Sequence, residues 1–391
     1  MRTIGVVTVA RSDYGIYLPI LCRLQDDPDL RLSLIVSGMH LSPEFGLTVK
    51  EIEADGFDIT ERVEMLLSSD TPEGVAKSMG LGLLGFAQLF GRWRPDILLV
   101  LGDRFEMHAA ALASLPFKIP VAHIHGGEST EGAIDEALRH SITKMSHLHF
   151  VTTDLYRRRV IGMGEEPWRV MVSGAPGLDN LHRLDLLDRN ELEKRFGFDF
   201  NRPLLLATYH PVTLDYERTP EQMEELFAAI DEVDANVIFT YPNADTRGRQ
   251  IIQLVEEYGA RNGRVWVGAN LGTQVYLSLM NHVTAMVGNS SSGIIEAASF
   301  KLPVVNIGSR QRGRVRERNV IDVDCRRAEI KDGLERAMSK AFRAGLDDLV
   351  NPYGDGHAAP KIISRLKEIK LDEKLILKRF NDVDNDGDWN K

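Results

Sequence analysis

The chain has 391 residues, of which 43% are hydrophobic and 27% charged, a composition typical of a globular protein with more than one core. Its formal net charge of −10 argues against a general nucleic-acid or anionic-membrane surface, so an anionic substrate needs a local basic pocket. The two cysteines, Cys22 and Cys325, lie too far apart in sequence for a zinc or redox motif. No apolar run reaches membrane length and no signal peptide precedes the first predicted strand, so we expect a cytoplasmic protein.

Short apolar runs alternate with helical segments through the first half of the chain. Strands are predicted at residues 3–10, 32–37, 97–101, 121–125, 149–152 and 170–173. Helices are predicted between them at 15–25, 43–54, 71–91, 104–115, 133–147 and 154–161. Continuous apolar strands separated by helices are typical of a parallel sheet covered on both faces.

The same rhythm restarts after a junction at Gly174-Ala-Pro-Gly177 and a charged segment. Further strands are predicted at 203–209, 237–241, 265–267, 285–288, 304–307 and 320–323. The fold class is therefore α/β, with two Rossmann-like doubly wound domains at 1–175 and 176–370. We expect the closing helices, at 328–343 and 359–369, to pack back across the junction.

Residues 371–391 form an acidic tail. Asp382, Asp384 and Asp386 imitate the start of a calcium loop, but such a loop requires a bidentate Glu at its twelfth position, which the sequence does not provide. A solvated tail is the favoured interpretation.

The stretch from His123 to Lys144 organises the first domain. It runs from a buried strand through Gly126-Gly127 into a helix, and Glu128 and Asp135 flank that turn. Asp103 ends the preceding strand. Because the carboxyl ends of parallel strands meet at one edge of a sheet, these three acids indicate proton-transfer chemistry there.

Histidines also gather in this region: His123, His125, His140, His147 and His149. Their spacing matches no known helical two-histidine metal motif, so core or orienting roles are favoured over metal catalysis. His210 ends the first strand of the second domain and is predicted to face a ligand.

A strand, a Ser/Gly turn and a helix start follow one another at Val287-Gly-Asn-Ser-Ser-Ser-Gly-Ile-Ile-Glu296. Backbone N–H groups and hydroxyls at such a turn suit a diphosphate, and Glu296 in the first helical turns suits ribose hydroxyls. Ordinary capping by Ser292 or a neighbour is the alternative.

Two arginines follow strands in opposite domains. Arg11 and Arg310 can clamp phosphate charge, since the guanidinium fork matches phosphate oxygens. The remaining arginines of the 312–318 loop are interpreted as a solvated basic surface.

Together these motifs resemble the hydrolysing UDP-N-acetylglucosamine 2-epimerases of sialic-acid and related nonulosonate biosynthesis. The specific pieces are Arg11-Ser-Asp-Tyr, Gly102-Asp-Arg-Phe-Glu106, His125-Gly-Gly-Glu128, Asp135-Glu-x-x-Arg-His140, Tyr209-His-Pro, Pro242-Asn and Gly288-Asn-Ser-Ser-Ser-Gly293. The resemblance extends to about residue 345. It implies two Rossmann-like domains facing a cleft, as in one large class of glycosyltransferases.

The resemblance also implies an activity and a set of site residues. The expected reaction converts UDP-N-acetylglucosamine and water to N-acetylmannosamine and UDP through a glycal. Implied catalytic residues are Asp103, Glu128, Asp135 and His210. Implied nucleotide-sugar contacts are Arg11, Arg104, Asn243, Ser290, Ser291, Glu296 and Arg310. No metal or redox cofactor is implied, and a homodimer or homotetramer is expected.

Three alternatives remain open at the level of sequence. The same reaction on UDP- or GDP-linked 2,4-diacetamido-2,4,6-trideoxy-glucose would serve legionaminic acid instead of sialic acid. A glycosyltransferase of the same architecture can also use the Ser290 turn, but has no need of three carboxylates at one sheet edge. A non-catalytic nucleotide-sugar sensor needs none of them.

Overall fold

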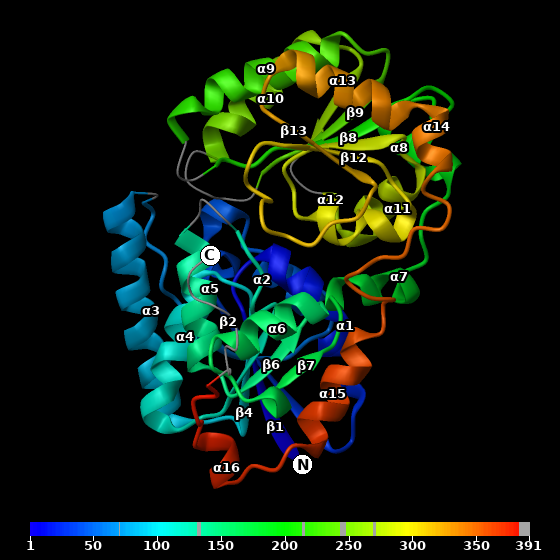
Figure 1. Ribbon diagram of the computed structural model, residues 1–391. Coiled ribbons are helices and arrows are strands. Elements are labelled where there is room, and N and C mark those ends of the chain that lie inside the picture. Colours follow the sequence, from blue (N-terminus) through cyan, green and yellow to red (C-terminus); the bar gives the residue numbers. More distant parts are fainter. Residues whose placement is uncertain (70, 131–133, 213–215, 243–247, 269–270, 383–391) are drawn as a thin grey trace, which may run out of the picture. The chain divides into compact units, whose positions relative to one another are not determined.

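The computed structural model describes residues 1–382 except 70, 131–133, 213–215, 243–247 and 269–270. The chain forms two compact units (Figure 1). Unit 1 consists of Met1–Glu128, Asp135–Asp179 and Gly356–Lys391, and unit 2 of Ser129–Ile134 and Asn180–Asp355. The chain thus returns to unit 1 at Gly356, within the stretch that the sequence assigned to the second domain.

Unit 1 is built on a seven-stranded parallel sheet with the order β3-β2-β1-β4-β5-β6-β7. Its strands are β1 (Arg2–Thr8), β2 (Leu30–Ser37), β3 (Ile59–Val63), β4 (Ile97–Leu101), β5 (Val121–Ile124), β6 (Leu148–Val151) and β7 (Val170–Val172). The edge strand β3 was not predicted, because Thr60, Glu61 and Arg62 interrupt any apolar run.

Helices cover both faces of this sheet. They are α1 (Arg11–Asp26), α2 (Val49–Ala54), α3 (Pro72–Arg92), α4 (Phe105–Ser114), α5 (Ile134–Met145), α6 (Asp154–Gly162), α15 (Ala358–Glu368) and α16 (Glu373–Ile376). α1 packs against α15, and α3 against α4 on the opposite side of the sheet (Figure 1). The helix predicted at 43–54 is shorter than expected: a 3₁₀ turn at Pro43–Phe45 ends in left-handed Gly46 before α2 begins.

Unit 2 holds a six-stranded parallel sheet with the order β10-β9-β8-β11-β12-β13. Its strands are β8 (Leu204–Thr208), β9 (Asn236–Thr240), β10 (Val265–Gly268), β11 (Ala285–Gly288), β12 (Val304–Ile307) and β13 (Val320–Val323). Each matches a predicted strand, because buried parallel strands are short continuous apolar runs. The prediction of two Rossmann-like doubly wound sheets is confirmed.

The helices of unit 2 include one that was expected elsewhere. They are α7 (Asn180–Arg183), α8 (Arg189–Phe196), α9 (Thr219–Asp231), α10 (Gly248–Arg261), α11 (Thr273–His282), α12 (Ser292–Ile295), α13 (Arg327–Met338) and α14 (Lys340–Ala344). α13 packs on α9 within unit 2. Of the two closing helices, therefore, only α15 joins unit 1.

Each sheet reverses its winding direction at one place. In unit 1 the reversal lies between β1 and β4, and in unit 2 between β8 and β11. Ligands of open α/β sheets bind beyond the carboxyl ends of the strands at such a switch point. Arg11 and Asp103 follow β1 and β4, while His210 and Asn289 follow β8 and β11. The topology therefore places predicted site residues at both switch points.

The segment after α15 is bound to unit 1 by hydrogen bonds and ion pairs. The sequence predicts a solvated tail for this segment instead. The buried guanidinium of Arg169 donates to the carbonyls of Lys374 and Leu375, each at 2.8 Å. Lys378 Nζ lies 2.8 Å from a carboxylate oxygen of buried Glu165. Burial opposes ionisation of Glu165, but hydrogen bonds from His149 and the nearby lysines outweigh it and lower its pKa to about 2. The aspartates of the calcium-like sequence beyond Asp382 lie outside the described residues.

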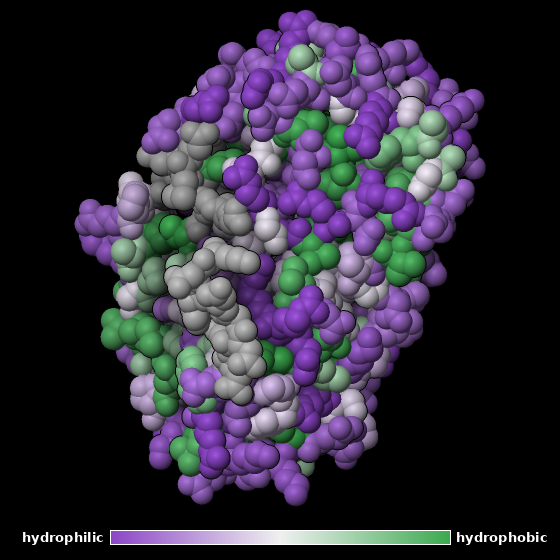
Figure 2. All heavy atoms as spheres, in the orientation of Figure 1, coloured by the Kyte–Doolittle hydropathy of each residue, from purple (hydrophilic) through white to green (hydrophobic). Residues whose placement is uncertain are grey.

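The visible surface is mainly hydrophilic, and hydrophobic side chains gather over α3 (Figure 2). Leu81 and Leu84 are among the exposed leucines of this helix. Within the described part of the chain, no helix combines the length and the apolar character needed to cross a bilayer.

Candidate active site

The carboxyl edge of β4 and β5 carries the acidic groups of unit 1. Leu101 pairs with Ile124, so Asp103 and His125 emerge from neighbouring strands at nearly the same level. Asp103 is ion-paired with Arg139 of α5, whose side chain is buried. A guanidinium in contact stabilises the ionised form of a carboxylate. Asp103 is therefore held as a fixed negative charge at the sheet edge.

The glycine turn after β5 positions Glu128. His125 has a φ of 64°, in the left-handed region that non-glycine residues rarely adopt. This turns the chain so that His125 Nδ1 lies 2.6 Å from Glu128 Oε1. Thr152, just beyond β6, donates its hydroxyl to the same oxygen at 3.1 Å. Glu128 is buried and tied to two strand ends.

Asp135 lies in the first turn of α5, one turn before Arg139. Residues at i and i+4 share a helix face, so Asp135 lies on the side of α5 that holds Asp103. Asp135 is only partly buried and acts electrostatically on Glu106. The structure thus brings the three predicted carboxylates to one region of unit 1.

The two predicted arginines of unit 1 begin or precede helices at the same edge. Arg11 opens α1 and pairs with Glu51 at 3.1 Å, and partial burial lowers its pKa. Arg104 is the N-cap of α4, and its positive charge favours ionisation of Asp13 and Glu106. Burial nevertheless raises the pKa of Asp13 to about 6, although Asp13 accepts from the N–H groups of Val9 and Ala10.

Glu106 was quoted in a motif but given no role. It is buried at 1% exposure, and neither carboxylate oxygen has a hydrogen-bond partner among the described residues. Burial raises its pKa to about 7. Gly38 makes room for it: a Cβ at that position would lie 3.0 Å from Glu106 Oε1.

The neighbouring histidines have structural partners. His123 Nε2 lies 2.7 Å from the Gly102 carbonyl, and burial lowers the pKa of His123 to about 3. His147 Nδ1 accepts from Val121 N–H at 3.1 Å, and His149 contacts Glu165. No cluster of three or more His, Cys, Asp or Glu side chains suited to a metal ion occurs in the part of the chain that is described.

In unit 2, Asn289 joins the ends of β8 and β11. Its Oδ1 accepts from the His210 N–H at 2.6 Å and its Nδ2 donates to the His210 carbonyl at 2.8 Å. The strands approach closely because position 288 is glycine; a Cβ there would lie 1.9 Å from the Thr208 carbonyl oxygen. His210 is buried and held by its backbone at the switch point.

The Ser/Gly turn leads into a helix of only four residues, α12. Ser290 Oγ accepts from Ser292 N–H at 3.3 Å, so part of the capping interpretation holds. Ser291 is the N-cap and makes no side-chain cap. Glu296, which the sequence places in the first helical turns, is the C-cap of this single turn. The helix ends because the chain tightens into 3₁₀ geometry at Ala297–Phe300.

Two side chains from the loop after β12 converge on the same turn. Arg310 Nη1 and Gln311 Nε2 both donate to the Asn289 carbonyl, at 3.1 and 2.8 Å. The predicted phosphate residues Ser290 and Arg310 are therefore adjacent in space. Asn243, the remaining predicted contact, lies outside the described residues.

Sequence reasoning missed several residues at these edges. Tyr276 of α11 is partly buried with its hydroxyl oxygen shielded from solvent, and burial followed by the charge of Glu296 raises its pKa to about 12. Asn289 was overlooked although it stands inside a quoted motif. His125 was grouped with the core histidines, and its place directly before two glycines was the signal that it occupies a turn.

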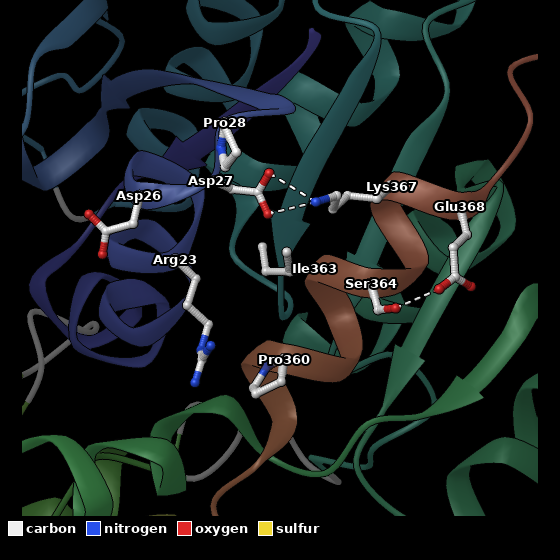
Figure 3. Close-up of a pocket in the computed structure, with 9 residues that line it drawn as sticks. All are labelled: Arg23, Asp26, Asp27, Pro28, Pro360, Ile363, Ser364, Lys367 and Glu368. Atoms are coloured by element: carbon white, nitrogen blue, oxygen red, sulfur yellow. Dashed lines mark hydrogen bonds and ion pairs between the residues drawn. The ribbon is translucent and has the colours of Figure 1, made fainter.

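One cavity is described in each unit. One of about 530 Å³ lies between α1 and α15 at the amino edge of the unit 1 sheet, far from the acids (Figure 3). There Lys367 contacts Asp27 at 3.0 Å, an interaction that holds α15 in place. The other, of about 780 Å³, lies beyond β8, β12 and β13 of unit 2 and is lined by Tyr209, Gly308 and Arg312.

Comparison of the chain with known protein families agrees with the fold and the site geometry. The profile of the family described as UDP-N-acetylglucosamine 2-epimerase matches residues 22–367. The chain belongs to this family. It is therefore an enzyme of the 2-epimerase type, and the resemblance carried by its motifs is confirmed.

Two relatives and one solved structure are similar to this chain over nearly its whole length. The chain is 40% identical over 385 residues to the GDP/UDP-N,N'-diacetylbacillosamine 2-epimerase (hydrolyzing) of Campylobacter jejuni, covering 98% of this chain and 99% of the relative. It is also 40% identical over 378 residues to the UDP-N,N'-diacetylbacillosamine 2-epimerase (hydrolyzing) of Legionella pneumophila, covering 97% and 99%. Among solved structures, the S. aureus MnaA–UDP co-structure has a TM-score of 0.80 at 17% identity, covering 94% of this chain and 96% of that one. This last similarity concerns the fold.

Proposed function

We propose that this 2-epimerase is hydrolysing and acts on UDP-linked N,N'-diacetylbacillosamine, a 2,4-diacetamido-2,4,6-trideoxy-glucose. The products are the free 2-epimeric sugar and UDP. The observation that carries the proposal is 40% identity, over nearly the whole chain, to two relatives whose names state this substrate. It replaces the expectation of UDP-N-acetylglucosamine and N-acetylmannosamine, which the motifs alone had favoured.

The carboxyl edge of unit 1 supports the chemical steps. Elimination removes the C2 proton and breaks the C1–O bond, giving a glycal and UDP; water then adds at C1 while a proton returns to C2 on the opposite face. Proton transfer needs groups that can exchange protons, and the positive charge that develops at C1 needs an anion nearby. We assign these tasks to the carboxyl edge that carries Asp103, Glu128 and Asp135.

The carboxyl edge of unit 2 supports nucleotide binding. We assign Ser290, Ser291 and Arg310 to the diphosphate, Glu296 to the ribose and His210 to the leaving group, with Arg11, Arg104 and Asn243 as further contacts. The convergence of Arg310 and Ser290 on the Asn289 turn favours this assignment. A guanidinium and hydroxyls together match a charged oxyanion. We further propose that the enzyme is a homodimer or homotetramer, which light scattering of the purified protein will test.

Substrate competition tests the proposal. We expect kcat/KM for UDP-N,N'-diacetylbacillosamine to exceed that for UDP-N-acetylglucosamine by at least about 100-fold, equal to about 2.7 kcal/mol of transition-state stabilisation. The GDP-linked sugar is measured beside them to determine the nucleotide. Equal or better turnover of UDP-N-acetylglucosamine would overturn the substrate assignment.

The same assay separates hydrolysis from group transfer. The reaction is run in heavy water without any acceptor sugar. Release of UDP together with a 2-epimer that carries deuterium at C2 is the expected result. Turnover that depends on an added acceptor would instead indicate a glycosyltransferase.

A further inference from the structure

The backbone of His125 adopts an energetically unfavourable left-handed conformation, and this conformation permits one specific side-chain contact. Its left-handed backbone, with φ of 64°, costs a non-glycine residue on the order of 1 kcal/mol, although glycines follow it at 126 and 127. That conformation brings Nδ1 to 2.6 Å from Glu128 Oε1. Strained non-glycine residues cluster at functional sites, where surrounding contacts maintain them.

The contact with Glu128 determines which imidazole nitrogen is free. An ionised carboxylate can only accept, so Nδ1 carries the proton and Nε2 carries the lone pair. Nε2 is buried and has no hydrogen-bond partner among the described residues. Buried polar atoms are nearly always paired, so an unpaired buried acceptor on an imidazole that contacts Glu128 points to a substrate contact.

The nearby acids are less suited to removing a proton from carbon. Asp103 is ion-paired with the guanidinium of Arg139, and Oε1 of Glu128 already accepts from His125 and Thr152. A neutral imidazole oriented by a carboxylate is a general base that works near neutral pH. The geometry therefore favours the histidine over either carboxylate.

We propose that His125 and Glu128 form a dyad in which His125 Nε2 removes the C2 proton and Glu128 positions the imidazole; this rests on the proposed epimerase function. The lone pair of Nε2 takes the proton, and the C2–H electrons form the C1=C2 double bond. The C1–O bond breaks, and its electron pair leaves with UDP. Asp103 supplies the negative charge that stabilises C1 as this bond lengthens.

Hydration then completes the cycle. The Asp135 carboxylic acid gives its proton to C2 on the opposite face, while a water oxygen bonds to C1 and releases one proton to solvent. The proton held by His125 returns to Asp135 through exchange with water. The sum is one substrate and one water consumed, with the free sugar, UDP and one proton formed.

Glycine is a matched substitution for the test, because it adopts positive φ without strain. We expect His125→Gly and His125→Gln each to lower kcat for the nucleotide sugar by about 10²–10⁴-fold, the usual share of a general base. UDP affinity and hydration of the separately supplied 2-acetamidoglycal should be retained. Added imidazole should restore at least tenfold of the activity of His125→Gly. His140→Gln, which changes a partly exposed histidine paired with Glu136, is the control.

Glu128→Gln tests the positioning role. Its amide oxygen still accepts from Nδ1, so activity should fall less than in the His125 variants. Because Glu128 orients the imidazole without contacting the nucleotide in this assignment, the loss should fall on kcat, and UDP affinity should stay at the wild-type value. The dyad is overturned if His125→Gln retains more than a tenth of the activity, or if Glu128→Gln is the more damaging change. Wild-type protein that releases no UDP from any nucleotide sugar would instead overturn the proposed function.

Discussion

The side-chain amide of Asn289 makes two hydrogen bonds to the backbone of His210. The distances are 2.6 Å to the His210 N–H and 2.8 Å to its carbonyl. This contact joins β8 to β11 at the switch point of unit 2. The Asn289 carbonyl in turn receives Arg310 and Gln311. One buried amide therefore organises the region that we assign to the nucleotide.

Asn289→Ala should lower the free energy of unfolding by about 2–6 kcal/mol. The substitution leaves a buried N–H and a buried carbonyl without partners, each of which costs about 1–3 kcal/mol. Urea unfolding followed by circular dichroism measures the change, with exposed Asn201→Ala as the control. A loss below about 0.5 kcal/mol would show that the reciprocal bonds contribute little.

Comparison with Glu106→Gln should show that ionisation of Glu106 lowers the free energy of unfolding of the wild type as the pH rises. Burial raises the folded pKa of Glu106 to about 7, above the 4.5 of a solvated glutamate. Protonated Glu106 therefore stabilises the fold below pH 4.5, and this contribution is lost as the pH rises to about 7. Relative to Glu106→Gln, the wild type should therefore lose about 3 kcal/mol across that window. Chemical unfolding at pH 4.5 to 8 measures it, and exposed Glu224→Gln should show no such trend. A pH-independent difference would contradict burial of an ionisable Glu106.

Truncation should distinguish the two parts of the C-terminal segment. Removing residues 372–391 takes the carbonyl acceptors of Lys374 and Leu375 from the buried guanidinium of Arg169 and the Lys378 ammonium from Glu165. Glu166 and His149 still contact these two groups, and stability should fall by about 3–5 kcal/mol. Removing residues 382–391 leaves those contacts intact and should change the melting temperature little. Differential scanning calorimetry compares the two. Equal melting temperatures would mean that the contacts of Arg169 do not support unit 1.

Arg310→Ala should weaken UDP binding by about 1.5–3 kcal/mol, the range for a hydrogen bond to a charged group. Isothermal titration calorimetry measures the affinity. Arg318→Ala is the matched control, because Arg318 lies in the same loop but pairs with Asp348. Unchanged affinity in folded Arg310→Ala would remove this residue from the proposed phosphate site.

Much of the fold could be predicted from local pattern. Buried parallel strands are continuous apolar runs, so all six strands of unit 2 and six of the seven in unit 1 were found. β3 was not predicted, because an edge strand carries polar residues at its exposed positions. Family motifs also directed attention to Asp103, Glu128 and Arg310, whose spatial neighbours the structure then identified.

What the sequence by itself determined is the alternation of strand and helix, the two doubly wound sheets and the family. These follow from short-range periodicity and from motifs of a few adjacent residues. The packing of distant elements decided that α15 returns to unit 1, that Arg139 is ion-paired with Asp103, and that His125 contacts Glu128 through a left-handed backbone. Such contacts depend on how distant elements pack and on single backbone torsions, and neither leaves a periodic trace in the order of the residues.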